Sequence, residues 1–119
     1  MVYALVNKME KIEKTIRYAK LFAIYKSQLS LTQQEIINDY YLLDLSLGEI
    51  AENRHISRSA VDDALSKGCN KLDDLENQLM ILRKQESLKT SLNNLRQKSL
   101  NQKQVDGIEE ILKELDYGI

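Results

Sequence analysis

Polar side chains that could bind nucleic acid are concentrated in one short segment, between positions 57 and 67. Hydroxyl and basic side chains contact phosphates and base edges when a helix enters the major groove of DNA. The candidate contacts in this segment are Ser57, Arg58, Ser59, Asp62, Ser66 and Lys67. These residue types predict a nucleic-acid-binding helix, provided that the surrounding elements expose them.

Two basic flanks could add contacts to phosphates. Residues 1–34 carry a net charge of +4 and residues 77–104 carry +5. Lysine and arginine bind nucleic acid by neutralising phosphates and releasing counterions. The candidate phosphate contacts are Lys11, Lys14, Arg83, Lys84 and Lys89. The alternative is that both flanks are ordinary solvated helix faces, and the sequence leaves both interpretations open.

The segment between the flanks is acidic. From residue 35 to residue 76 there are ten acidic residues and four basic ones. Asp62 and Asp63 would lie in the first turns of the candidate helix, where a carboxylate suits the helix dipole but repels phosphate. A second hypothesis therefore stays open, in which the segment is a protein-interaction or scaffolding module that has lost DNA binding.

The composition gives little support to catalysis or metal binding. His55 and Cys69 are the single histidine and the single cysteine, too few for a metal site. The four glycines are isolated, so no phosphate-binding loop is present. Cys69 falls beside an apolar helical seam and is expected to be a buried structural residue. We expect no catalytic residue, no metal and no cofactor, and hence a protein that is not an enzyme.

The cysteine content and the hydropathy of the chain indicate where the protein is located. One cysteine excludes an internal disulfide and fits a reducing compartment. No apolar run approaches the ~20 residues that span a bilayer, and the segment MVYALVNK is too short and polar for a signal peptide. The sequence predicts a cytoplasmic protein with no membrane insertion.

The elements that would position the candidate contacts form a helix-turn-helix over about residues 46–68. Ser46 and Glu49 have the spacing of a capping box, which begins a short helix at Leu47. A turn is expected at residues 54–56, and Ser57 would begin the next helix. Two short helices joined by a tight turn are the usual way to place a second helix in a major groove.

The rest of the chain is also predicted to be helical, since it contains no proline. One helix is expected from Lys11 to Leu29, and Thr32 with Glu35 would cap the next. The fourth helix would run past Leu82 and kink near residues 85–87. Asp106 and Glu109 would cap a last helix. Gly68 in the fourth helix predicts a close crossing by another helix.

The predicted fold is therefore all-α: a helix-turn-helix bundle with a long fourth helix and additional C-terminal helices. A helix-turn-helix domain is expected over residues 1–82, and a helical extension over residues 83–119 packed on that domain or at a dimer interface. Apolar stripes in the C-terminal half predict a homodimer. They consist of Leu88, Leu92, Leu95, Ile108, Ile111, Leu112 and Leu115. The alternative is that the last helix folds back onto helix 1 or 4 of its own chain.

Residues 9–100 resemble the YlxM family, small bacterial helix-turn-helix proteins associated with the signal recognition particle. The matching segments are MEKIEKT at Met9–Thr15, LTQQ at Leu31–Gln34, DYYLLDLSLGEIAE at Asp39–Glu52 and ISRSAV at Ile56–Val61. The family resembles the fourth region of primary bacterial sigma factors. The resemblance implies an all-helical homodimer that regulates the signal recognition particle pathway, with DNA or the particle's RNA or protein as partner. Residues 1–8 would be an upstream extension.

The segment ISRSAVDDALSKG departs from the family pattern, which is similar to ISRQAVYDNIKR. Asp62 replaces an aromatic residue and Gly68 a larger or charged one. Sigma-like readers have arginines where this chain has Ala60 and Asp62, and His55 occupies a turn position that often holds glycine. These changes weaken the expectation of base-specific binding and leave the packing pattern intact.

Overall fold

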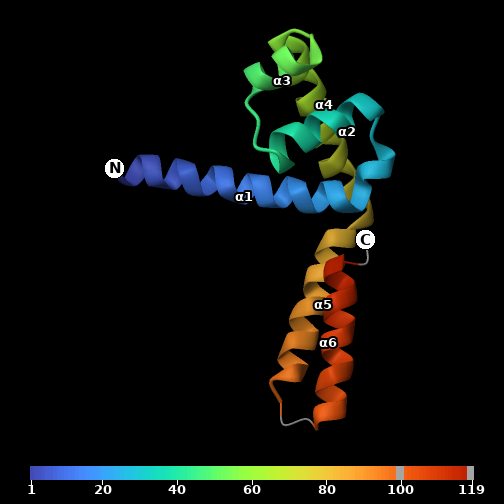
Figure 1. Cartoon of the computed structure of the whole chain (residues 1–119). Coiled ribbons are helices and arrows are strands. Elements are labelled where there is room, and N and C mark those ends of the chain that lie inside the picture. The colour runs from blue at the N-terminus through green and yellow to red at the C-terminus, as the bar shows by residue number, and fades with distance from the viewer. Residues whose placement is uncertain (99–100, 118–119) are drawn as a thin grey trace. The chain divides into compact units, whose positions relative to one another are not determined.

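The computed structural model describes residues 1–98 and 101–117 and confirms the all-α fold (Figure 1). Its helices are α1 (Val2–Tyr25), the 3-10 helix η1 (Lys26–Gln28), α2 (Leu31–Ile37), the π-helix η2 (Asn38–Leu42), α3 (Leu47–Arg54), α4 (Arg58–Leu79), α5 (Ile81–Arg96) and α6 (Gln102–Tyr117). They form two compact units, unit 1 (Met1–Gln78) and unit 2 (Leu79–Ile119). The division between them falls earlier than the boundary predicted after residue 82.

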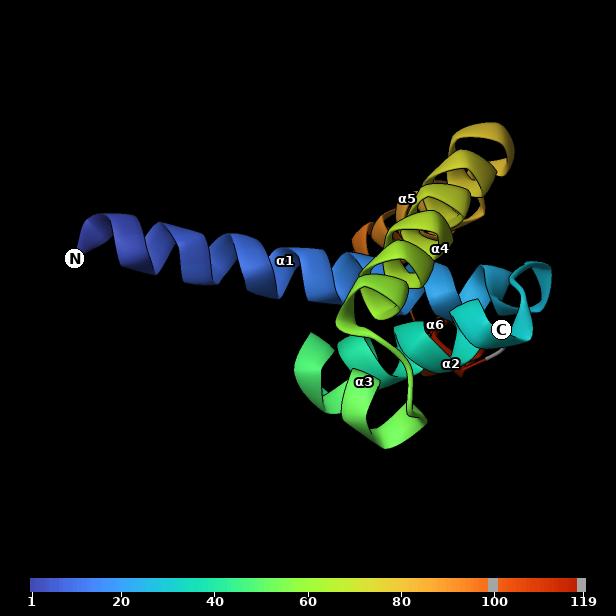
Figure 2. The same ribbon diagram turned by 90° about the horizontal axis from the view of Figure 1, so that it is seen from above.

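The core of unit 1 forms where α4 crosses α1 and α2, as Figure 2 shows for α1. Apolar side chains from four helices are buried there, and those of α4 follow one face of that helix. They include Leu21 and Phe22 of α1, Ile36 and Ile37 of α2, Ile50 of α3, and Val61, Leu65 and Leu72 of α4. Burying this common face is what holds the helix-turn-helix on α1.

Two tyrosines of α1 form hydrogen bonds with the C-terminal part of α4. The Tyr18 hydroxyl donates to Asp73 Oδ2 at 2.7 Å, and Arg17 Nη2 donates to Asp73 Oδ1 at 3.0 Å. The Tyr25 hydroxyl donates to the buried Glu76 carboxylate at 2.7 Å. Because a buried carboxylate without a partner is costly, these bonds fix the position of α4 along α1.

Gly68 permits the close approach of α4 and α2. A Cβ atom at this position would lie 2.7 Å from Ile37 Cδ1 and 3.5 Å from Gln33 Cβ. Ile37 is fully buried, so it has little room to move. The predicted helix crossing at Gly68 is confirmed, and the crossing helix is α2.

One of the three predicted capping boxes is confirmed and two are wrong. Ser46 Oγ accepts from Glu49 N, and Glu49 Oε1 accepts from Ser46 N, both at 3.1 Å. The cap of α2 is Ser30 with Gln33, in place of Thr32 with Glu35. For α6 the reciprocal pair is Asn101 with Gln104, in place of Asp106 with Glu109. The last position of a capping box accepts glutamine as well as glutamate. Neighbouring pairs of residues therefore fitted the same pattern, and the sequence did not decide between them.

Two helix boundaries also differ from the prediction. The first helix begins at Val2, well before Lys11, and ends at Tyr25, after which η1 continues to Gln28. The long fourth helix ends at Leu79, because Met80 adopts a left-handed conformation with φ 55°. The break therefore precedes the kink predicted at residues 85–87, which lie inside α5. The left-handed backbone conformation costs a residue such as methionine ~1–2 kcal/mol, so the residue type gave no reason to predict the break here.

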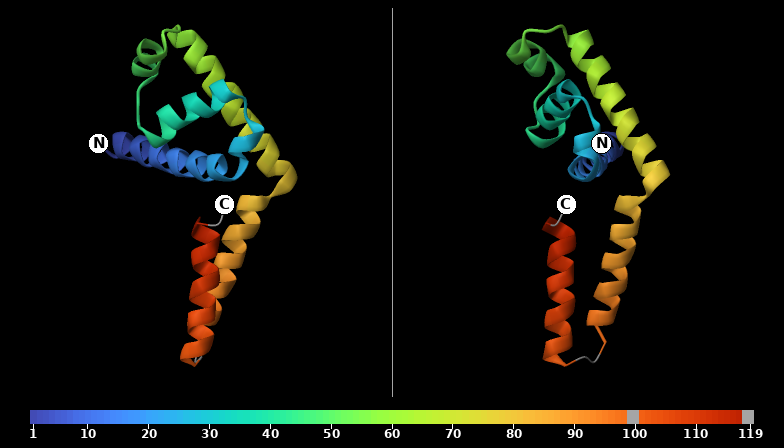
Figure 3. Two further views of the ribbon diagram at one scale, coloured as in Figure 1. Left: turned by 45° about the vertical axis from the view of Figure 1, so that its right-hand side comes forward. Right: turned by 90° about the vertical axis from the view of Figure 1, so that its right-hand side faces the viewer.

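Unit 2 is a hairpin in which α6 folds back antiparallel to α5 (Figure 3). Ion pairs join Lys89 to Asp116 and Arg96 to Glu109 across the hairpin. Ile108 is buried, whereas Leu88 remains 46% exposed. Leu95 and Ile111 are also exposed, so the hairpin covers the C-terminal apolar stripes only in part, and the dimer contact expected there stays a prediction.

We predict a packing conflict between Gly68 and Ile37 that a double-mutant cycle will reveal. Gly68→Ala should gain ~1 kcal/mol of helix preference but overpack the crossing. Ile37→Val removes the methyl group that the new Cβ would meet. The alanine should therefore be more favourable in the Ile37→Val background by about 1–3 kcal/mol in urea unfolding.

Gly107→Ala provides the matched control, because nothing lies within 4 Å of a Cβ at Gly107. That substitution should show only the helix gain. Independent effects of Gly68→Ala and Ile37→Val would contradict the proposed close approach.

Candidate nucleic-acid interface

The helix-turn-helix is formed by α3, a turn at His55 and the first turns of α4. His55 ends α3 in the left-handed region, with φ 56° and ψ 42°, which reverses the chain where many such motifs have glycine. Ser57 Oγ accepts a hydrogen bond from Ala60 N at 3.0 Å, so Ser57 caps the N-terminus of α4 as predicted. The chemistry of the motif then depends on what α4 presents to solvent.

Each of the six predicted contacts near the start of α4 is exposed. The buried stripe of the same helix begins at Val61 and continues through Leu65 and Gly68. In the first three turns of α4 the polar side chains are therefore exposed, on a different face from the buried residues. Exposure alone makes these side chains available to a ligand; their charges decide which ligand.

The cations of the motif have different roles. Arg54 Nε donates to Asp39 Oδ2 at 2.6 Å and Arg54 Nη1 to Glu35 Oε2 at 2.8 Å. The hydrogen bond with Asp39 raises the pKa of Arg54, so this side chain stays charged and ties α3 to α2 and η2. Lys67 pairs with Asp63 at 3.0 Å. Among the described residues Arg58 has no ion-pair partner, so its charge is available.

A groove of about 390 Å³ lies where α1 passes the helix-turn-helix. Its lining includes Lys11, Tyr40 and Arg58, together with Asp44 and Glu49. The π-helix η2 brings Tyr40 to this groove, while its neighbour in sequence is buried. The structure thus unites one cation from the N-terminal flank with one from α4, although they are 47 positions apart in the chain.

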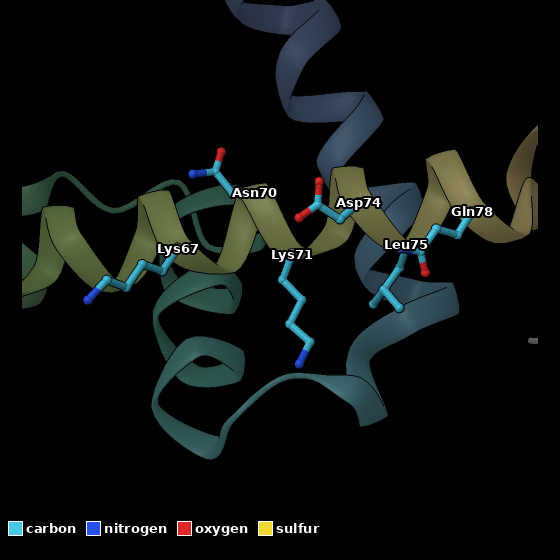
Figure 4. Close-up of a pocket in the computed structure, with 6 residues that line it drawn as sticks. All are labelled: Lys67, Asn70, Lys71, Asp74, Leu75 and Gln78. Atoms are coloured by element: carbon cyan, nitrogen blue, oxygen red, sulfur yellow. The ribbon is translucent and has the colours of Figure 1, made fainter.

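A second, shallower groove of about 360 Å³ runs along α4 (Figure 4). It includes Lys67, Asn70 and Lys71, of which only Lys67 was predicted as a contact. Lys71 makes no ion pair with any described residue. Its position one turn after Lys67 is the sequence signal that could have found it, because residues four apart lie on one helix face.

The other predicted phosphate contacts are not part of the Lys11–Arg58 groove. Lys14 is exposed on α1, and Arg83 and Lys84 are exposed on α5 in unit 2. Lys89, also in unit 2, is 32% exposed and pairs with Asp116. Lys89 is therefore less available than Lys14.

The remaining reactive side chains serve the core. Tyr41 is buried and stacks on Tyr18 with ring centroids 5.2 Å apart. The Cys69 thiol lies 4.0 Å from the Tyr41 hydroxyl, and burial raises the pKa of Cys69. A buried, protonated thiol is a poor nucleophile.

Within the described residues no cluster of histidine, cysteine and carboxylate side chains could hold a metal ion. In the same part of the chain no helix is long and apolar enough to cross a membrane.

Fold and site together define a helix-turn-helix protein. Residues 12–114 match the family UPF0122, described as "Putative helix-turn-helix protein, YlxM / p13 like", and the chain belongs to this family. It is 35% identical to the UPF0122 protein YlxM of Bacillus subtilis over 105 residues, which cover 88% of this chain and 96% of that protein.

Two further relatives extend the comparison. A UPF0122 protein of Mycoplasma mycoides is 35% identical over 102 residues, covering 85% of this chain and 90% of that protein. One from Bacillus thuringiensis is 44% identical over 73 residues, covering 61% of this chain and 66% of that protein.

We predict that the packing beneath the interface weakens at alkaline pH. Burial, with the hydrogen bond to Asp73, raises the pKa of Tyr18 to about 12, and burial also raises the pKa of Tyr41. An unfolded tyrosine ionises near pH ~10, so the folded state holds these protons more tightly. Their contribution is complete below about pH 10 and is lost as pH rises toward about 12.

Urea unfolding at a series of pH values between about 8 and about 11 measures this loss. The Tyr18→Phe variant lacks one of the titrating hydroxyls and should lose less stability over the same range. Identical losses in the two proteins would contradict the role of Tyr18.

Proposed function

We propose that this protein is a regulator that binds nucleic acid through the groove shared by α1, α3 and α4. Lys11 and Arg58 would hold successive phosphates, and the exposed polar residues at the start of α4 would face the bases. As the YlxM resemblance implies, the proposed setting is the signal recognition particle pathway, with the particle RNA or a DNA site as ligand.

The observation that carries this proposal is the convergence of Lys11 and Arg58 on one groove beside the helix-turn-helix. Phosphate binding requires cations that are both exposed and uncommitted. Arg54 is committed to Asp39 and Glu35, whereas Arg58 is not. Tyr40 in the same groove offers an aromatic face and a hydroxyl, which suit contact with a nucleotide.

The acidic residues of the site affect the expected strength and base preference of nucleic-acid binding. Asp44 and Glu49 line the groove, and Asp62 is exposed on α4. Carboxylates repel phosphates but accept hydrogen bonds from the amino group of cytosine. Weak, strongly salt-dependent binding is therefore expected, with any base preference depending on a few polar contacts.

A protein-interaction module is the second candidate, and the charge of residues 35–76 favours it. Residues 35–76 carry six more acidic than basic side chains, and Asp62 and Asp63 are exposed at the tip of α4. Such a surface complements a basic protein partner. Recovery of the signal recognition particle protein without RNA, in a pull-down from native cells treated with nuclease, would favour this candidate over nucleic-acid binding.

We predict that the double variant Lys11→Ala/Arg58→Ala weakens binding to RNA or DNA, by about 1–3 kcal/mol for each lost contact. The slope of log affinity against log salt should also fall by about 0.9 for each phosphate contact removed from duplex DNA. Fluorescence anisotropy over a salt series measures both quantities, and circular dichroism checks that helicity is unchanged.

Lys103→Ala/Lys113→Ala is the matched control, because it removes the same charge from exposed positions of α6. It should bind almost as the wild type does. Equal losses in the two double variants would mean that net charge, and not the groove, governs binding.

A further inference from the structure

An apolar seam lies exposed along the N-terminal half of α1. It consists of Val2, Leu5, Met9, Ile12 and Ile16, which are between 50% and 77% exposed. Their spacing alternates three and four residues, which is the a/d pattern of a coiled coil. Figure 2 shows these first turns of α1 extending clear of α2, α3 and α4.

The seam lies on the face of α1 that points away from the unit 1 core. A helix turns about 100° per residue, which places Ile12 and Ile16 roughly opposite Tyr18 and Leu21. Tyr18 contacts α4 and Leu21 is fully buried, so they mark the face toward the core. Lys11, on that same face, lines the groove. One side of α1 therefore packs in the core of unit 1, and the opposite side carries the exposed apolar seam.

The width of the stripe indicates what covers it. At about 100° per residue, the five seam positions fall within an arc of about 80°. Val6, at the e position beside Leu5, is also exposed and widens the apolar face to about 120°. An a, d and e stripe of this width is what a helix presents to another helix packed against it. Polar residues lie on both sides of the stripe, including Lys8 and Glu13.

These flanking charges are complementary between two copies of α1. With the seam positions as a and d, Lys8 falls at g and Glu13 at the following e. In a parallel, in-register pair each g residue meets the e residue five positions later on the partner helix. Lys8 of each copy would thus meet Glu13 of the other, giving two attractive pairs related by the two-fold axis.

We propose that two copies of this chain associate through the α1 seam as a short, parallel, two-stranded coiled coil. The core layers would be formed by the five seam residues, each against its own counterpart. Because only two heptads contribute, the association is weak and concentration-dependent. The proposal does not rest on nucleic-acid binding, and it places the dimer contact in α1, in contrast to the C-terminal contact predicted from the sequence.

Sedimentation velocity over a wide concentration series tests the pairing. The wild type should pass from monomer to dimer, and Met9→Lys/Ile12→Lys should raise the dissociation constant at least tenfold. Both positions are exposed, so the variant is expected to fold. Ala4→Lys/Asn7→Lys is the matched control, with the same added charge on exposed positions of α1 outside the seam; it should dimerise as the wild type does.

A wild type that stays monomeric at every concentration would overturn the proposal. So would a Met9→Lys/Ile12→Lys variant that dimerises as strongly as the Ala4→Lys/Asn7→Lys control.

Cross-linking tests the orientation. Cys69 is buried, so Leu5→Cys introduces an exposed thiol at a d position. In the parallel arrangement the two copies of this residue face each other, within reach of a disulfide. In an antiparallel pair with Met9 opposite Ile12 they would be about 16 Å apart. Rapid formation of a disulfide-linked dimer under mild oxidation is expected, and its absence in a protein that still dimerises would exclude the parallel arrangement.

Discussion

The crossing of α4 over α1 and α2 is the interaction on which the rest of unit 1 depends. Gly68 lets α4 approach Ile37, and the hydroxyls of Tyr18 and Tyr25 fix Asp73 and Glu76 on the next turns. Apolar burial supplies the energy of this contact, and the hydrogen bonds set its register, because a shift along the helix would leave the buried Glu76 carboxylate without its tyrosine partner. The direction of α4, and with it the position of Arg58, follows from this packing.

This packing also decides which cations of the helix-turn-helix are held in ion pairs. Arg54 looks from the sequence like a free cation of the motif, but Asp39 and Glu35 hold it as a brace for α3. Arg58, the first residue of α4, has no ion-pair partner among the described residues, and it lines the same groove as Lys11. Charge availability therefore depends on which carboxylate the fold brings near each cation, and simple counts of acidic and basic residues do not reveal it.

The sequence predicted part of the local structure and one distant contact. The Ser46–Glu49 box and the cap at Ser57 follow from short-range rules, whereas the boxes expected at Thr32 and Asp106 form at neighbouring positions. The crossing at Gly68 was predicted because glycine inside a helix is costly unless another helix approaches closely. The left-handed break at Met80 was missed, because methionine has no preference for that conformation. The groove was missed as well, since it joins Lys11 to Arg58 across the tertiary fold.

Backbone amide shifts measured by NMR during titration with an RNA hairpin or a DNA duplex test the central claim most directly. The account predicts that the largest perturbations map to the residues lining the groove, around Lys11, Ser46 and Arg58, and that they fade as salt is raised. Perturbations confined to α5 and α6, or none at low salt, would contradict it.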